Sequence, residues 1–391
     1  MTTLPGGDTL LQVLRRPGLT AAIAAISIVG IALSLGLPLL ALVLESRGIT
    51  PLWIGINTAV AGVASIAVTP FVMPWARRFG TANLVLACVV GATVSFLGFY
   101  LAQPFWVWFP LRIVFHGTTT IIFILSEFWI NDQAPNARRG AIMGIYAACL
   151  SVGFMVGPLI ITVLGSDGAT PFIAGAIIML LAALPVLMAR KAAPRMEEEP
   201  SAPFTRFLVA APMATLAAFV FGAVESGSLS LMAVYGMRIG YDAADAVLLV
   251  SAISAGNIAL QFPLGLLSDR LDRRHMLVAC AVAGALGAAL IPFAAHNLAL
   301  LLAIIFVSGG FMAGLYTIGL IHLGARFSGT DLASANAAFV MMYSIGMLVG
   351  PAMMGVALNS SNPHWLPWSI SGIFLLYIVV VIPRMRLETK P

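Results

Sequence analysis

The chain has 391 residues, of which 60% are hydrophobic and only 9% are charged, and its mean hydropathy is +1.02. This composition lies far outside the range of soluble domains and is typical of integral membrane proteins. The formal net charge of +5 does not indicate nucleic-acid binding, because the cations lie between apolar runs and not on a soluble domain. We therefore expect a lipid bilayer around the chain and no nucleic-acid partner.

Apolar runs of about 20 residues recur along the chain without the period-two alternation of membrane strands, which favours helices over a barrel. The run that begins at Leu19 is too long for a cleavable signal peptide, so we take it as the first span. We predict an all-α membrane protein with twelve transmembrane helices, at residues 19–44, 52–75, 81–103, 107–130, 140–163, 171–189, 207–236, 246–267, 275–295, 299–323, 333–357 and 366–383.

Lysine and arginine are distributed unevenly over the predicted connections. All of them except Arg47, Arg112 and Arg238 fall on the side of the membrane that holds the N-terminus. Because positive charge accumulates in cytoplasmic loops, this asymmetry predicts that both termini are cytoplasmic.

A stretch rich in proline and charge lies between the sixth and seventh predicted spans. Such composition marks a linker. We predict an N-terminal six-helix bundle at residues 1–189, a cytoplasmic linker at 190–206 and a C-terminal six-helix bundle at 207–391.

The two predicted bundles repeat one another in sequence. The segment 153–158, Gly-Phe-Met-Val-Gly-Pro, matches the segment 346–351, Gly-Met-Leu-Val-Gly-Pro, at an offset of 193 residues. At an offset of 192 the charged segment 265–272 falls on residues 73–80. A duplicated six-helix unit is how many secondary transporters are built, so we expect two pseudo-symmetric bundles.

The charged segment 265–274 resembles the signature loop of the major facilitator superfamily, G-x-L-(A/S)-D-R-x-G-R-(R/K). Asp272 replaces the second glycine of that pattern, and the copy in the first half has lost its acid but keeps Arg78 and Gly80. The resemblance implies that this loop braces the cytoplasmic side and opens when the two bundles rock. The residues that carry this conformational role are Gly265, Asp269, Arg270, Arg273, Arg78 and Gly80.

The segment from Gly153 to Pro158 resembles the fifth-helix motif of drug:proton antiporters in the same superfamily, although the usual following glycines are absent. The chain is also similar to small bacterial YcaD-like carriers, which implies the bacterial inner membrane as its location. Glycines at four-residue spacing allow close helix packing, and proline bends the helix beyond them. We expect that role for Gly153, Gly157, Pro158, Gly346, Gly350 and Pro351.

Apart from His275 and His322 at span ends, four ionisable side chains fall inside predicted spans: Arg112, His116 and Glu127 in the fourth and Glu225 in the seventh. Each costs about 2.5–3.5 kcal/mol or more at a bilayer centre unless it faces water or a partner, so each is a functional candidate. At 100° per residue, the three in the fourth span share one face. In the family that the chain resembles, helices one, four, seven and ten line a central cavity, which would place all four residues on the substrate path.

Glu225 is the preferred proton-coupling residue, because Ser226, Gly227 and Ser228 follow it and invite water into the helix. We place it in the outer half of its span, at the depth of Arg112. A Glu225–Arg112 pair that forms in one conformation and breaks in another would bind and release a proton. The alternative for each residue is structural: Arg112 ties helix ends together, and Glu127 pairs with a cytoplasmic arginine.

Aromatic residues in the spans are further candidates for the cavity wall, each with helix packing as the alternative: Phe115, Trp129, Tyr146, Tyr235, Tyr316 and Tyr343. The cysteines Cys88, Cys149 and Cys280 all lie in apolar runs, which indicates buried side chains and not disulfides or metal ligands. Because we find no metal-ligand cluster, nucleophile elbow or phosphate loop, we predict no metal, no cofactor and no enzymatic activity.

The sequence thus predicts a proton-coupled secondary active transporter of small molecules that works by alternating access as a monomer. Export of amphipathic, drug-like compounds is favoured by the glycine-proline motif. Uptake of a solute with protons and transport of lipid remain as alternatives.

Overall fold

The computed structural model describes residues 16–134, 139–194, 211–268, 270–327 and 329–388. Within these ranges the chain is almost entirely helical. The helices of the first half are α2 (Pro17–Ser46), α3 (Pro51–Phe79), α4 (Thr81–Leu101), η1 (Phe105–Val107), α5 (Trp108–Gln133), α6 (Arg139–Leu164), α7 (Thr170–Ala182), α8 (Leu184–Met188) and η3 (Arg190–Ala192). Those of the second half are α10 (Pro212–Arg238), α11 (Ala243–Ser268), α12 (Arg273–Leu290), η4 (Ile291–Ala294), α13 (Leu298–Arg326), α14 (Gly329–Leu358) and α15 (Trp365–Glu388).

Each predicted span corresponds to one of these helices or to two consecutive ones. In the described ranges, eleven helices are long and apolar enough to cross a membrane, and the apolar segment Ala148–Leu164 of α6 is shorter. Proline at the first turn begins α2, α3 and α10, where its missing N–H is not needed. The chain is therefore a multi-pass membrane protein, as its composition predicts. The predicted linker falls largely on residues 195–210, outside the described residues.

The repeated glycines place two helix pairs in equivalent contact. In the first half, a Cβ added at Gly153 on α6 would lie 3.0 Å from the Cα of Gly30 on α2. In the second half, a Cβ added at Gly346 on α14 would lie 2.8 Å from the backbone nitrogen of Ala223 on α10. Because real Cβ atoms rarely come this close to backbone, only glycine permits these helix separations. The sequence repeat thus corresponds to a repeat of helix packing.

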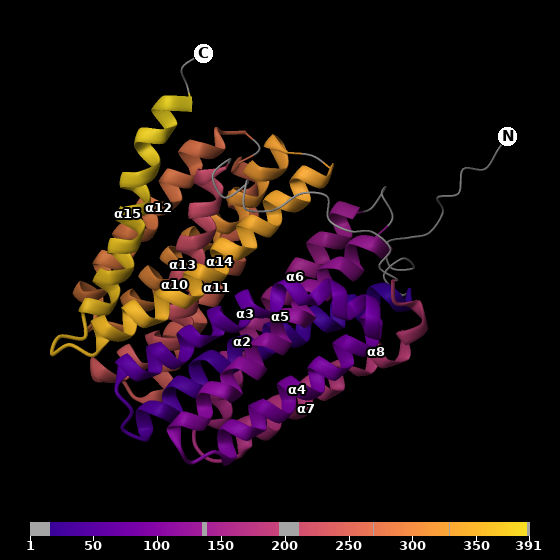
Figure 1. Cartoon of the computed structure of the whole chain (residues 1–391). Coiled ribbons are helices and arrows are strands. Elements are labelled where there is room, and N and C mark those ends of the chain that lie inside the picture. Colours follow the sequence, from indigo (N-terminus) through magenta and orange to yellow (C-terminus); the bar gives the residue numbers. More distant parts are fainter. Residues whose placement is uncertain (1–15, 135–138, 195–210, 269, 328, 389–391) are drawn as a thin grey trace.

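The two halves meet at what we call the distal face, which carries the α2–α3, α10–α11 and α14–α15 connections. The terminal face, on the other side, is where α2 begins and α15 ends. Glu45 at the end of α2 and Arg238 at the end of α10 form an ion pair of 2.9 Å. Thr58 on α3 and Ser230 on α10 share a hydrogen bond of 2.9 Å. From this end, the helices of the two halves separate toward the terminal face (Figure 1).

Close backbone contact between α3 and α14 reinforces this junction. A Cβ added at Gly55 would lie 2.9 Å from the Cα of Gly355, and one added at Gly62 would lie 2.7 Å from the Cβ of Leu348. Gly55 lies one turn into α3 and Gly355 lies one turn before the end of α14, so both are near the distal face. The halves are thus held together at one end of the molecule.

Candidate functional site

A cavity of about 420 Å³ lies between the two halves. Four helices of each half contribute to its wall: α2, α3, α5 and α6 from the first, and α10, α11, α13 and α14 from the second. The expectation that spans one, four, seven and ten line a central cavity is confirmed, and spans two, five, eight and eleven join them. Three of the four predicted coupling residues, His116, Glu127 and Glu225, are on its wall.

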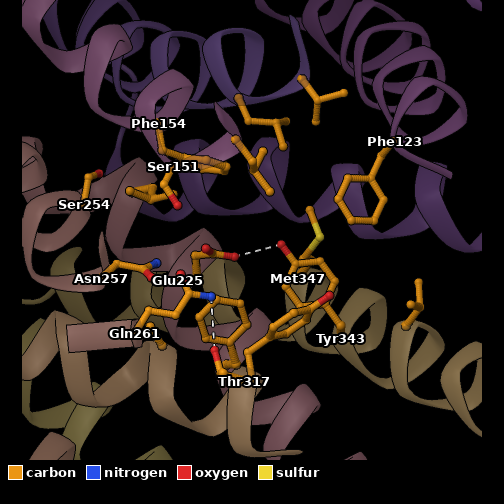
Figure 2. A pocket seen from close by; sticks show the side chains of 18 of the residues that line it. Phe123, Ser151, Phe154, Glu225, Ser254, Asn257, Gln261, Thr317, Tyr343 and Met347 are labelled. Carbon is orange, nitrogen blue, oxygen red and sulfur yellow. Dashed lines mark hydrogen bonds between the residues drawn. The ribbon is translucent and has the colours of Figure 1, made fainter. Parts of the chain in front are cut away.

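Glu225 lies at the middle of α10, thirteen residues from either end of the helix, and is 8% exposed. The hydroxyl of Tyr343 on α14 donates a hydrogen bond of 2.8 Å to its Oε2 atom (Figure 2). A buried carboxylate requires such a partner, because burying a polar group without a hydrogen bond is costly. The placement of Glu225 in the outer half of its span is wrong, because α10 covers Pro212–Arg238 instead of the predicted 207–236, so its centre lies closer to the distal face.

Arg112 does not reach the cavity. It lies in the second turn of α5 and is fully buried, and its Nε and Nη2 atoms donate hydrogen bonds of 3.0 and 2.9 Å to Oδ1 of Asn57 on α3. Its guanidinium carbon is 5.5 Å from the centre of the Phe99 ring on α4. The side chain therefore joins three helices of the first half.

The expected Glu225–Arg112 pair is absent from this conformation, since each of the two side chains is bonded to another residue. The two residues do not pair because they lie at different distances from the distal face. At 1.5 Å per residue, Arg112 is roughly 6 Å along α5 from its distal end, and Glu225 is roughly 20 Å along α10 from its own. The shared face predicted for the fourth span therefore reaches the cavity only from His116 onward.

His116 and Glu127, both on the cavity wall, differ in how far their side chains are exposed. His116 is 1% exposed, and in the part of the chain that the structure describes no partner of its ring nitrogens has full hydrogen-bond geometry, although the backbone of Arg112 is close enough to interact with the ring. Glu127 is exposed, six residues before the end of α5, and is close enough to Tyr146 and Tyr316 to interact with them electrostatically. Tyr316 interacts electrostatically with Glu225 as well, and all three residues line the cavity.

Of the aromatic candidates, Tyr146, Tyr316 and Tyr343 line the cavity. Phe115 and Trp129 are fully buried away from it among neighbouring helices. The hydroxyl of Tyr235 is 3.1 Å from Nδ1 of His364 in the α14–α15 connection. Among the described residues, the alternative of helix packing therefore holds for Phe115, Trp129 and Tyr235.

Sequence reasoning missed a polar stripe on α11. Ser254, Asn257 and Gln261 all face the cavity, and the Gln261 amide donates a hydrogen bond of 3.1 Å to the hydroxyl of Thr317 on α13 (Figure 2). The stripe lies beside Glu225, while Phe123 and Phe154 come from the wall formed by the first half. Spacings of three and four residues place the stripe on one helix face, a signal that the predicted span 246–267 already contained.

The signature-like loop lies at the terminal face, between α11 and α12, with Asp269 outside the described residues. Asp272 is the N-cap of α12, and its Oδ1 accepts a hydrogen bond of 2.8 Å from the backbone N–H of Arg274. Burial raises the pKa of the Asp272 carboxyl, but hydrogen bonds from the backbone of Arg274 and His275, together with their charges, hold it below its ordinary value. Arg270 is exposed, and Arg273 is half-buried.

The glycines Gly80 and Gly265 of the two loops differ in whether the structure requires glycine at their positions. Gly80, between α3 and α4, has a φ of 84°, which favours glycine, and the preceding Arg78 is exposed with its guanidinium 5.4 Å from the Phe79 ring. A Cβ added at Gly265 would meet its nearest atom, on Thr317, only at 4.0 Å. Packing therefore does not demand glycine at 265 in this conformation. The conformational role of all these residues stays a prediction.

Known proteins with similar sequences and similar structures are transporters of one family. A family profile described as Major Facilitator Superfamily matches residues 22–259 and 242–391. The chain is 25% identical over 369 residues to YfkF of Bacillus subtilis, described as an uncharacterized MFS-type transporter, with 90% of this chain and 93% of YfkF covered. It is 22% identical to YcaD of Escherichia coli, described in the same words, over 88% of this chain and 92% of YcaD.

Two solved structures share the fold. The nucleoside transporter NupG superposes with a TM-score of 0.71 at 13% identity and covers 95% of this chain and 100% of its own. A bacterial homologue of the human lysosomal transporter Spinster, solved in an inward-facing and occupied conformation, has a TM-score of 0.71 at 16% identity, over 93% and 94% of the two chains. With the family profile matched over nearly the whole chain, this protein belongs to the Major Facilitator Superfamily.

Proposed function

We propose that the protein is a proton-coupled secondary active transporter that binds a small molecule in the central cavity and exports it by alternating access. The observation that carries this proposal is the position of the two membrane carboxylates. Glu127 comes from the first half and Glu225 from the second, and both line the cavity between the halves. A rocking movement of the halves would change the surroundings of both carboxylates at once.

The contacts at the distal face support an assignment of the conformation. With the terminal face cytoplasmic, as the lysine and arginine distribution favours, the Glu45–Arg238 and Thr58–Ser230 contacts close the exterior side. The state described here is then the inward-facing one. Export proceeds when these contacts break and contacts form instead near the loops at the cytoplasmic side.

Glu225 is the proposed proton carrier. Its carboxylate is held by Tyr343 in this state, and movement of α14 relative to α10 would alter that hydrogen bond and the access of water. The affinity of a carboxyl group for a proton depends on both, so one transport cycle can take up a proton on one side and release it on the other. Arg112, bonded to Asn57, holds α5 against α3 and does not pair with Glu225 in this state.

The test is counterflow in proteoliposomes with a panel of cationic, neutral and anionic ligands and a pH-sensitive dye inside. We expect ligand movement to drive proton movement in the opposite direction, and the pH profile of transport to flatten in Glu225→Gln. Proton movement in the same direction as the ligand would indicate uptake by symport. Transport that depends on Na⁺ instead of protons would indicate that sodium is the coupling ion. Transport with an unchanged pH profile in Glu225→Gln would exclude Glu225 as the carrier.

Location and assembly are parts of the same proposal: the bacterial inner membrane, both termini cytoplasmic, and a monomer as the working unit. A C-terminal fusion that fluoresces only in the cytoplasm tests the orientation. Flipping of fluorescent phospholipid in the same liposomes tests the lipid-transport alternative, and we expect the rate to equal that of protein-free liposomes.

A further inference from the structure

Arg238, at the end of α10, is held by two partners at the distal face. Its Nε atom lies 2.9 Å from Oε1 of Glu45 on α2, which joins the two halves. Its Nη1 atom donates a hydrogen bond of 3.4 Å to the backbone carbonyl of Leu358, the last residue of α14. The ion pair that closes this face therefore depends on how the end of α14 positions the guanidinium.

The connection between α14 and α15 is attached to α10 at both of its ends. It begins after Leu358, to which Arg238 is bonded, and it ends at His364, whose Nδ1 atom is 3.1 Å from the hydroxyl of Tyr235. Tyr235 precedes Arg238 by three residues, so both side chains lie on one face of α10. Tyr235 is fully buried, and its ring centre is 6.0 Å from that of the imidazole. A change at His364 thus reaches Arg238 through both the connection and the helix.

The bond between Tyr235 and His364 depends on the charge of the imidazole. A neutral histidine has a lone pair on one ring nitrogen, and the hydroxyl of Tyr235 donates to it when that nitrogen is Nδ1. Protonation turns Nδ1 into a donor. The buried hydroxyl then faces another donor, and its hydrogen loses the one acceptor that the described residues offer it. Because a buried hydroxyl without an acceptor is costly, charge on His364 favours separation of the two side chains.

The surroundings of His364 also oppose its charged form. The side chain is half-buried and lies outside the helices that span the membrane. Burial lowers the pKa of His364 below its ordinary value, and so does the neighbouring His296 in the α12–α13 connection. Arg238 on α10 is a further cation at this face, and the Glu45 carboxylate on α2 is already bound to it. A state in which His364 is released therefore takes up a proton more readily than the closed state does.

We propose that His364 is a proton-binding site on the exterior face that controls the opening of the distal end. When His364 takes up a proton from an acidic exterior, its bond to Tyr235 breaks, the end of α14 loosens its hold on Arg238, and the outward-facing state gains population. The site is separate from Glu225, which lies thirteen residues, or roughly 20 Å, deeper along α10 than Arg238. This inference rests on the orientation and the alternating access proposed above, and it adds regulation by the external pH.

Distances between spin labels across the distal face test the proposal without a transported ligand. Thr50→Cys in the first half and Ala244→Cys in the second provide exposed labelling sites, in a Cys149→Ala background because Cys88 and Cys280 are buried. The full-length protein in lipid nanodiscs is measured at pH of about 7.5 and about 5.5, on either side of the ordinary histidine pKa. We expect the ratio of the long-distance to the short-distance population to rise by roughly three- to tenfold on acidification, as a pKa difference of about one unit between two states predicts. Equal populations at the two pH values would overturn the proposal.

Substitutions at His364 assign the response to this side chain. His364→Gln keeps an acceptor for Tyr235 but carries no charge, so its population ratio should change by less than about twofold between the two pH values. His364→Lys is charged at both and should favour the long distance at both. His275→Gln is the matched control, because His275 is an exposed histidine at the terminal face, and its response should equal that of the wild type. A full acid response in folded His364→Gln would contradict the proposed site.

Three further variants separate the parts of the device. Tyr235→Phe lacks the hydroxyl and should raise the long-distance population already at the higher pH, and gel filtration checks that this variant is folded. His296→Gln removes the neighbour that opposes protonation, so the midpoint of the response should move to higher pH. Glu225→Gln should retain the part of the response that His364 causes, because the two groups are distinct. Loss of the whole response in Glu225→Gln would assign the response to the proposed proton carrier and overturn the role of His364.

Failure of this inference is distinguishable from failure of the proposed function. If a ligand undergoes proton-coupled counterflow while the distances across the distal face do not respond to pH, the protein is a transporter and the switch is wrong. If acid opens the distal face through His364 but no compound in the panel is moved, the switch stands and the transport function falls.

Discussion

Gly350 on α14 packs so closely against α10 that a side chain at this position must force the two helices apart. A Cβ there would lie 2.5 Å from both the Cα and the carbonyl carbon of Ala223, whereas carbon atoms rest about 3.5–4.0 Å apart. Both contacts are with backbone, so no rotamer change relieves them. The helices would have to separate by roughly 1 Å along a tightly packed interface.

We therefore expect Gly350→Ala to lower the free energy of unfolding by about 1–3 kcal/mol, the usual cost of overpacking. This loss outweighs the gain of up to about 1 kcal/mol that alanine brings to a helix interior. Gly372→Ala on α15 is the matched control, because this glycine is exposed and a Cβ there would meet nothing within 4 Å. Its stability should stay the same or rise.

Thermal unfolding of both variants in one detergent, followed by tryptophan fluorescence, measures the difference. We expect the midpoint of Gly350→Ala to fall by a few degrees and that of Gly372→Ala to remain at the wild-type value or above. Equal midpoints for the two variants would refute the reasoning, because backbone contact would then not set the distance between α10 and α14.

Three further predictions concern charge and hydrogen bonding. Glu45→Gln removes the half-exposed ion pair with Arg238 and should shift the conformational equilibrium away from the state described here by roughly two- to fivefold. Distances between spin labels across the distal face measure this shift. Additive effects of Glu45→Gln and Arg238→Gln in a double-mutant cycle would contradict the pairing. Tyr343→Phe removes the donor to Glu225 and should shift the pH profile of transport, with the intact ring as its own control for packing; an identical profile would exclude the coupling role of this bond. The pKa of Asp272 is below its ordinary value in the folded protein, so the ionised carboxylate contributes stability above pH of about 4, and this contribution is lost as the pH falls further. Asp272→Asn should therefore lower the unfolding midpoint at pH 7, and the difference from wild type should shrink toward pH 3. A difference that stays constant with pH would show that the charge is not involved.

The ionisable residues and three tyrosines of the cavity wall could be found from the chain alone, but the rest of the wall and the pairing of its side chains could not. His116, Glu127 and Glu225 were identified because an ionisable residue within an apolar run is costly unless it faces water or a partner. The partners were not identified. Glu225 is bonded to Tyr343 and Arg112 to Asn57, and neither partner is distinguished in the sequence from other polar residues in spans. The coupling roles themselves, and the division into two domains, stay predictions.

The sequence by itself determined the helices and the repeat, because the length of an apolar run and the spacing of glycines are local properties that a bilayer converts directly into spans and close contacts. Tertiary structure decided which polar groups meet. The rotation of each helix about its axis and its displacement along the membrane normal depend on packing against all its neighbours, and a displacement of two residues moves a side chain by about 3 Å. Packing thus decided that Glu225, at the middle of α10, meets Tyr343, and that Arg112, near the distal end of α5, meets Asn57.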